Sequence, residues 1–292
     1  MRPISGKKCT LLFALTLLGP SWASAADLYV SAQGTSSSDG RVYRITPAGS
    51  QSTFFGGLSF PEGIAIDSGG NVFVGDFKGN INKITPAGTG SIFASGIFPF
   101  GLAFDRSGNL FEADANGIIN KFTPAGSRST FASGLSNVQG IVCDAIGDVF
   151  LADGLSTIYK YSPTGVQSTF ASGLNGPVGL AFDLSGDLFA SAANSGTIYK
   201  FTPTGVRSTF ASGLSRPWGL ACDSNGNLFA AETTTDLIDA FTPTGIQSTF
   251  ASGLASPVFL AFNQAAVPEP TALLLLLVGA AGAGICYRRK RT

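Results

Sequence analysis

The 292-residue sequence contains no histidine and only one methionine, and only 12% of its residues are charged. Without histidine, the chain cannot use an imidazole as a catalytic base, a catalytic acid or a metal ligand. Ordinary soluble domains have ~25% charged residues, so this composition excludes a long solvated helix or a coiled coil. Hydrophobic residues make up 44% of the chain, which excludes an intrinsically disordered protein.

Glycine and phenylalanine are abundant instead, with 38 and 24 copies. The formal net charge of zero hides an uneven distribution, because residues 26–267 carry 11 Lys and Arg against 17 Asp and Glu. This central part therefore has an excess of six negative charges and no basic stripe. A nucleic-acid partner needs such a stripe to neutralise phosphates, so nucleic acid is excluded as a partner.

The first 25 residues have the three parts of a secretory signal peptide, and we expect signal peptidase to remove them. In order, these parts are the cations Arg2, Lys7 and Lys8, the apolar run 11–18, and the small residues Ala23 and Ala25 before the cleavage point. Cys9 precedes the apolar run rather than following it, which argues against a lipoprotein signal. The sequence therefore predicts an exported protein.

The C-terminal end carries a second targeting pattern. Residues 271–287 form an apolar run of 17 residues, at the short limit for a transmembrane helix. The cations Arg288, Arg289, Lys290 and Arg291 follow it and should stay on the cytoplasmic side of the membrane. The run therefore predicts a membrane anchor.

The residues before this run are Val267, Pro268, Glu269 and Pro270, and two prolines keep this junction out of the helix. The junction, the apolar run and the basic cluster together resemble the PEP-CTERM sorting signal of exopolysaccharide-producing bacteria. The resemblance implies that residues 265–292 hold the exported protein in the inner membrane until an exosortase cuts near Pro268-Glu269-Pro270. The protein would then reach the cell surface, the outer envelope or the extracellular matrix. The alternative is a simple anchor that is never cut.

Between the two ends, one unit of about 40 residues is repeated. Its marker is a turn of the form [Thr/Ser]-Pro-[Ala/Thr]-Gly, whose prolines are Pro47, Pro86, Pro124, Pro163, Pro203 and Pro243. Each unit contains four short apolar or alternating runs that end at Gly, Pro, Asn or Asp, as expected of four strands. A period of this length with four strands per unit predicts the blades of a β-propeller.

The number of blades follows from the two ends of the repeat region. Residues 28–30 match the second strand of a unit, and the missing first strand appears at residues 257–262. Pairing these segments completes a sixth blade and hides two strand edges. We therefore predict an all-β, six-bladed propeller over residues 26–264. The unit resembles NHL-type and SMP-30/gluconolactonase-like propellers, a fold that supports enzymes and scaffolds alike.

Most of the repeated polar and aromatic residues are explained by folding. An Asp-x-x-Gly turn recurs at Asp67, Asp105, Asp144, Asp183 and Asp223, where we expect turn hydrogen bonds rather than calcium ligands. A core phenylalanine recurs at Phe73, Phe111, Phe150, Phe189 and Phe229. Cys143 and Cys222 occupy equivalent positions two blades apart, which favours buried thiols over a disulfide.

A binding site in a propeller requires residues that break the repeat. The most variable position is the x of Pro-x-Gly at the start of the innermost strand, which rims one mouth of the central channel. In blade order this position holds Glu62, Phe100, Gln139, Val178, Trp218 and Val258. We expect Glu62, Phe100, Gln139 and Trp218 to contact a ligand.

Gluconolactonase-like enzymes use this rim to hold a divalent metal, and Glu62-Gly63 resembles their Glu-Gly motif. The other rim positions offer no Asn or Asp, and calcium takes six or more oxygen ligands. The residues therefore favour no metal and no cofactor. Virginiamycin-lyase-like propellers also resemble the chain, but their chemistry relies on histidine.

A second asymmetric set lies at the end of the second strand, where Asp76, Asp114, Asp153 and Glu232 are acidic. Loop hydrogen bonds are the expected role of these four side chains. Glu112 replaces the small or apolar residue of other blades, and the sequence offers no account of it.

Two function classes remain at this stage. One is a non-catalytic module that binds an exopolysaccharide or an envelope protein through the Phe100 and Trp218 rim. The other is a metal-dependent lactonase or hydrolase with a degenerate site at Glu62. The absence of histidine and the incomplete metal site favour the first class.

Overall fold

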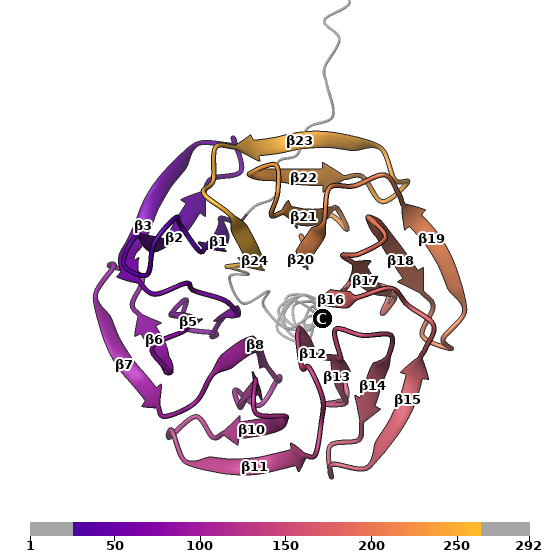
Figure 1. Ribbon diagram of the computed structural model, residues 1–292, viewed down its shortest axis with the longest axis horizontal. Helices are drawn as coiled ribbons and strands as arrows, with labels where there is room; N and C mark the ends of the chain where they lie inside the picture. Colours follow the sequence, from indigo (N-terminus) through magenta and orange to yellow (C-terminus); the bar gives the residue numbers. More distant parts are fainter. Residues whose placement is uncertain (1–25, 264–292) are drawn as a thin grey trace, which may run out of the picture.

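The computed structural model describes residues 26–263, which form a ring of six antiparallel four-stranded sheets (Figure 1). This architecture is the predicted six-bladed propeller. In each blade the strands run from the channel axis outward. The signal peptide predicted at 1–25 and the sorting segment predicted at 265–292, with the residues named in them, lie outside the described residues.

The six blades in chain order, each from the innermost strand to the outermost, are β24 (Pro257–Phe262), β1 (Leu28–Ala32), β2 (Gly40–Ile45) and β3 (Gln51–Leu58); β4 (Ile64–Ile66), β5 (Val72–Asp76), β6 (Asn80–Ile84) and β7 (Gly90–Ser95); β8 (Pro99–Phe104), β9 (Leu110–Asp114), β10 (Ile118–Phe122) and β11 (Arg128–Ser133); β12 (Ile141–Cys143), β13 (Val149–Ala152), β14 (Ile158–Tyr161) and β15 (Gln167–Ala171); β16 (Pro177–Phe182), β17 (Leu188–Ala192), β18 (Thr197–Phe201) and β19 (Arg207–Ala211); β20 (Pro217–Cys222), β21 (Leu228–Glu232), β22 (Leu237–Phe241) and β23 (Gln247–Ser252).

The two ends of the described chain close the ring. Strand β24 pairs antiparallel with β1, with Leu28 opposite Phe262 and Val30 opposite Leu260. The side chains of Leu28, Val30, Leu260 and Phe262 belong to one buried cluster with residues of the preceding blade. The predicted closure of the sixth blade is confirmed.

Each blade packs on its neighbours through the repeated phenylalanine of its second strand. The ring of Phe73 makes edge contacts with Phe93 of its own blade and with Phe104 of the next blade, at centroid distances of 5.1 and 5.0 Å. Phe150 repeats this pattern with Phe170 and Phe182. Offset and edge contacts of this kind suit the quadrupoles of aromatic rings, and they tie adjacent blades together.

The Asp-x-x-Gly turns after the innermost strands are built as expected. Asp67 Oδ1 accepts hydrogen bonds from the backbone N–H groups of Gly69 and Asn71, at 2.9 and 2.8 Å. Gly70 in the same turn has φ of 77°, a conformation that favours glycine. The corresponding aspartates of the next four blades accept the same pair of turn amides.

At the other side of the ring, where the innermost strands begin, the backbones of neighbouring blades come very close to one another. A Cβ atom added to Gly63 would lie 2.7 Å from the carbonyl oxygen of Phe100 in the next blade. The same clash with the next blade would occur at four further glycines of the Pro-x-Gly series, namely Gly101, Gly140, Gly179 and Gly219. These glycines therefore allow a close approach of backbones around the axis.

The last member of this series is Phe259, where a side chain replaces glycine. Here Ser31 Oγ donates a hydrogen bond to the carbonyl of Glu62 at 2.6 Å and accepts one from the N–H of Phe259 at 3.2 Å. A serine hydroxyl thus completes the ring of contacts. We call this end of the channel the proline mouth, and the end at the Asp-x-x-Gly turns the aspartate mouth.

Candidate functional site

The four residues predicted to contact a ligand all lie at the proline mouth, where Val178 separates Trp218 from the consecutive positions of Glu62, Phe100 and Gln139. Glu62 and Phe100 line one depression together with Phe77 and Phe98. Trp218 packs against the cluster that contains Val178, Val258 and Phe259. The backbone carbonyl of Gln139 lies against Gly101, between these two groups.

Glu62 is buried, with 4% of its surface exposed. Gln33 donates a side-chain hydrogen bond to Glu62 Oε1, whereas Oε2 has no partner among the described residues. Burial raises the pKa of Glu62 from its ordinary value of 4.5 to about 8, against the opposing effect of the Gln33 hydrogen bond. The carboxyl group is therefore protonated at neutral pH, and it can donate as well as accept a hydrogen bond.

Two further side chains at this mouth carry unpaired polar atoms. Gln139 Oε1 and Trp218 Nε1 are buried and have no hydrogen-bond partner within residues 26–263. The face of the Trp218 ring is covered by the guanidinium of Arg216, 4.9 Å from the ring centroid. The ring of Phe100 lies edge-on to that of Phe77. The residues around this mouth thus hold an acceptor, a donor and a neutral carboxyl that are buried without partners beside aromatic rings.

The backbone leading into the proline mouth is strained. Four of the five non-glycine residues with positive φ in the described part of the chain precede the Pro-x-Gly segments: Phe60, Asn137, Arg216 and Ser256. Their φ values lie between 43° and 58°, where a side chain other than glycine is unfavourable. Strain of this kind concentrates at functional sites.

The proline mouth has little enclosed space. The depression lined by Glu62 and Phe100 leaves no room for even a water molecule, so a ligand would lie on this surface rather than inside a pocket. Within residues 26–263, no group of three or more Asp, Glu or Cys side chains lies close enough together to hold a metal ion. The buried, neutral Glu62 and a single amide do not fit the oxygen-rich shell that calcium requires.

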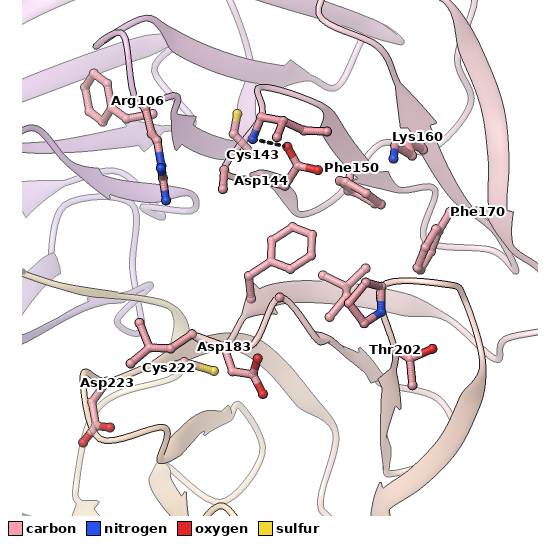
Figure 2. Close-up of a pocket in the computed structure, with 18 residues that line it drawn as sticks. Arg106, Cys143, Asp144, Phe150, Lys160, Phe170, Asp183, Thr202, Cys222 and Asp223 are labelled. Carbon is pink, nitrogen blue, oxygen red and sulfur yellow. Dashed lines mark hydrogen bonds between the residues drawn. The ribbon is translucent and has the colours of Figure 1, made fainter.

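The aspartate mouth contains a larger cavity, of about 490 Å³ (Figure 2). It shares Phe104, Cys143, Phe182 and Cys222 with the channel, which has a volume of about 370 Å³. Its other lining residues include Arg106, Asp144, Lys160 and Asp183. This cavity was not predicted from the sequence. A signal was present, since Arg106, Ile146 and Leu184 differ from the small or polar residues of other blades at these turn positions.

The acidic residues at the ends of the second strands bind loop backbone, as expected. Asp76 accepts a hydrogen bond from the N–H of Lys78 at 3.0 Å, and Asp153 accepts three from the loop that follows it. Asp114 accepts one from the N–H of Phe98 in the preceding loop. Glu232 accepts one from the N–H of Ser215 in the same way.

Glu112 is fully buried and lies directly opposite Asn120 in the next strand. Asn120 donates a side-chain hydrogen bond of 2.7 Å to Glu112 Oε2, and Oε1 has no partner among the described residues. Burial raises the pKa of Glu112 to about 8, so this carboxyl is also neutral at pH 7. Asn120 stands where three other blades have Tyr43, Tyr159 or Tyr199, and its position opposite Glu112 was the missed signal.

Cys143 and Cys222 are free thiols, and no bond joins them. Each belongs to the cluster of a repeated phenylalanine, Phe111 for Cys143 and Phe189 for Cys222. Burial raises the pKa of both thiols far above the ordinary range, which makes them poor nucleophiles.

Comparison with known proteins identifies the C-terminal segment. Residues 266–290 match the PEP-CTERM protein-sorting motif. The chain carries a PEP-CTERM sorting signal. The signal implies an exported protein that passes through the membrane and is processed by an exosortase. No helix between residues 26 and 263 is long and apolar enough to span a bilayer.

The propeller of this PEP-CTERM protein is similar to several solved structures. A chain of a nidogen/laminin complex matches with a TM-score of 0.74 and 20% identity, covering 82% of this chain and 99% of that one. A virginiamycin B lyase from Staphylococcus aureus matches with a TM-score of 0.62 and 17% identity, covering 80% and 91%. The calcium-binding protein regucalcin from Agrobacterium tumefaciens matches with 0.59 and 15%, covering 68% and 76%. At these identities the likeness shows the fold alone. None of the curated proteins matches the chain.

Proposed function

We propose that this protein is a non-catalytic binding module that is exported, held in the inner membrane by its tail, and then released by an exosortase to the cell surface or extracellular matrix. Its ligand is a glycan, such as an exopolysaccharide, bound at the proline mouth. Glu62, Phe100, Gln139 and Trp218 are the contact residues.

The observation that carries this proposal is the set of unpaired polar atoms on Glu62, Gln139 and Trp218. A buried polar group without a partner costs about 1 to 3 kcal/mol, and a bound ligand that supplies the partner removes this cost. Sugar hydroxyl groups both donate and accept hydrogen bonds, which suits a set that contains an acceptor, a donor and a protonated carboxyl. Phe100 and Trp218 are half-buried, and the parts of their rings left exposed offer apolar contact to a sugar ring.

A glycan array probed with the purified, processed protein tests the proposal. We expect Trp218→Ala and Gln139→Ala each to weaken binding at least tenfold. Val206→Ala is the matched control, because Val206 is exposed on an outer turn far from this mouth and should leave binding unchanged. If the array is silent and an envelope protein binds with the same dependence on Trp218, the ligand is a protein.

The alternative function is a metal-dependent lactonase or hydrolase with a degenerate site. The specific observation in its favour is the raised pKa of Glu62, a feature of many catalytic carboxyl groups. A thermal shift with calcium or zinc that Glu62→Ala abolishes would favour this alternative. The same shift in the variant would leave the metal unrelated to Glu62.

Processing of the tail is tested separately. Replacing Pro268, Glu269 and Pro270 with alanine should leave the propeller folded but trap the full-length protein in the inner membrane. The measurement is the intact mass of wild-type and variant proteins from an exosortase-bearing host. Wild-type protein that retains Arg288–Arg291 in most molecules would make the tail a permanent anchor.

A further inference from the structure

Five large aliphatic side chains on the aspartate side of the ring are exposed to solvent. They are Ile146, Val166, Leu184, Val206 and Ile246, with 62% to 76% of each residue exposed. We call this set the aliphatic crescent. It extends over three neighbouring blades, which are formed by β12 to β15, β16 to β19 and β20 to β23.

The crescent breaks the repeat, so blade folding does not explain it. The residue after the [Thr/Ser]-Pro-[Ala/Thr]-Gly turn, between the third and fourth strands of each blade, is polar in three blades. There it is Ser50, Thr89 or Ser127. In the other three blades it is Val166, Val206 or Ile246. A solvent-facing turn gains no packing from these larger apolar side chains. The substitutions instead place exposed apolar side chains at equivalent turns of three neighbouring blades, where they are available for contact with an apolar partner.

All five residues lie on one face of the ring. In each antiparallel blade the innermost and third strands run in the same direction, so the turns that follow them lie on the same side. For one blade the cavity in Figure 2 illustrates this, because it is lined both by Asp183 after β16 and by Thr202 after β18.

The chain leaves the propeller on this same face, close to the axis. The last strand, β24, ends at Phe262, which lines the channel. Asn263 follows at the position that Asp67 and its equivalents hold in other blades. A Cβ atom on Gly70, in the neighbouring aspartate turn, would lie 3.6 Å from Asn263 Oδ1. The sorting tail therefore begins at the aspartate mouth.

The link from this exit to the apolar run is short. Residues 264–270 are seven residues and span at most roughly 25 Å when fully extended. To bring the proline mouth to the membrane, the link would run outward past three strand spacings, roughly 14 Å, and then along a strand of five or six residues, roughly 17 Å. That path is longer than the link. A path through the channel is closed by side chains at the proline mouth, where Val178, Val258 and Phe259 are buried in one cluster.

We propose that the aspartate face of the propeller docks on the lipid surface of the membrane while the tail holds the precursor, with the aliphatic crescent contacting the lipid at the headgroup boundary. The inference rests on the proposed retention of the precursor by its tail. Apolar side chains gain free energy by entering this boundary. The orientation leaves the proline mouth facing away from the membrane, open to a ligand before cleavage.

The test uses the full-length protein in vesicles of phosphatidylethanolamine and phosphatidylglycerol at 3:1, with a nitroxide quencher on the lipid headgroups. A fluorophore is attached to Leu184→Cys on the aspartate face or to Leu155→Cys, an exposed leucine beside the proline mouth. Wild-type protein gives the background labelling of the native cysteines. We expect at least threefold stronger quenching at position 184. Equal quenching, or stronger quenching at position 155, would overturn the proposed orientation.

Flotation of the vesicles separates this inference from the function it rests on. A chain that does not float with lipid has no membrane anchor, and both proposals are then wrong. A chain that floats but shows equal quenching at the two positions keeps the anchor and loses the docked face.

A second pair of variants separates the crescent from the short link. Insertion of 20 Gly and Ser residues after Gln264 removes the length constraint, so any remaining bias comes from lipid contact. We expect stronger quenching at position 184 to persist in this variant. It should disappear when Val166→Ser, Val206→Ser and Ile246→Ser are added. Loss of the bias on insertion alone would show that the crescent does not bind lipid.

Discussion

The two mouths of the channel are formed by the two ends of the same six strands, yet their surfaces differ. The proline mouth is tightly packed, has strained backbone and holds unpaired polar atoms between aromatic rings. The aspartate mouth is wider, and its carboxylates are bound to the amides of their own turns. Buried polar atoms at one end thus lack hydrogen-bond partners among the described residues, while carboxylates at the other end stabilise their own turns.

The largest effect is expected from removing β24, the innermost strand that closes the ring and contributes to both mouths. Deleting residues 255–263 removes β24, which pairs with β1 and completes the sixth blade. The inner edge of β1 would then be exposed and the ring disrupted, and the truncated protein should aggregate or lose cooperative unfolding. Thermal unfolding and size-exclusion chromatography measure this. A truncated protein with wild-type melting temperature and solubility would contradict ring closure.

The next effect concerns the tight packing of the proline mouth. In Gly179→Ala the new methyl group would collide with the backbone carbonyl of Trp218, and we expect a loss of about 2 to 3 kcal/mol of unfolding free energy. Gly56→Ala is the matched control, because an added Cβ there meets no atom within 4 Å. Urea denaturation of both variants is the measurement. Equal stability of the two variants would mean that the mouth is more open than described.

Two buried glutamates give a smaller effect that depends on pH. The pKa values of Glu62 and Glu112 are raised by burial to about 8, above the ordinary value of 4.5. The folded state therefore binds more protons, and the stability from each neutral carboxyl is complete below pH 4.5 and is lost as the pH rises towards 8. Glu62→Gln and Glu112→Gln should each become more stable than wild type over this range, by on the order of 2 kcal/mol at pH 8.

Thermal unfolding of these variants from pH 5 to 9 sharpens the comparison between mouth and blade interior. Both variants should show a flatter pH dependence than wild type. The contribution of each glutamate is the difference in pH dependence between wild type and its glutamine variant. A bound glycan should alter the contribution of Glu62, at the proline mouth, and leave that of Glu112 unchanged. Parallel pH profiles for wild type and both variants would show that these carboxyl groups are ionised in the folded protein.

Sequence reasoning was sufficient for the blades, because the period, the prolines and the glycines act locally within each unit. It also located Glu62, Phe100, Gln139 and Trp218 at one mouth, because equivalent repeat positions occupy equivalent places around the axis. It did not predict how little space this mouth encloses, which depends on backbone contacts between blades at Gly63 and its equivalents. The Glu112–Asn120 pair was missed because it depends on the register between two strands.

The aliphatic crescent was also missed, because no single unit contains it. Its residues come from two different turns in three blades, and only the shared direction of the first and third strands brings them to one face. Arg106 and the cavity of the aspartate mouth escaped prediction for the same reason. Features that a single repeat encodes are therefore predictable, whereas surfaces assembled across repeats require the three-dimensional structure.

The smallest effect is expected from replacing the crescent itself. Val166→Ser, Val206→Ser and Ile246→Ser should each change the unfolding free energy by less than about 0.5 kcal/mol, because these side chains are exposed and bury little surface in the folded protein. Ala251→Ser in β23 is the contrasting control, since Ala251 is buried and a hydroxyl group there should cost more. Urea denaturation of the soluble, processed protein measures both. A loss above 1 kcal/mol for any crescent variant would mean that its side chain packs within the propeller, and the surface would then be part of the fold rather than a contact for lipid.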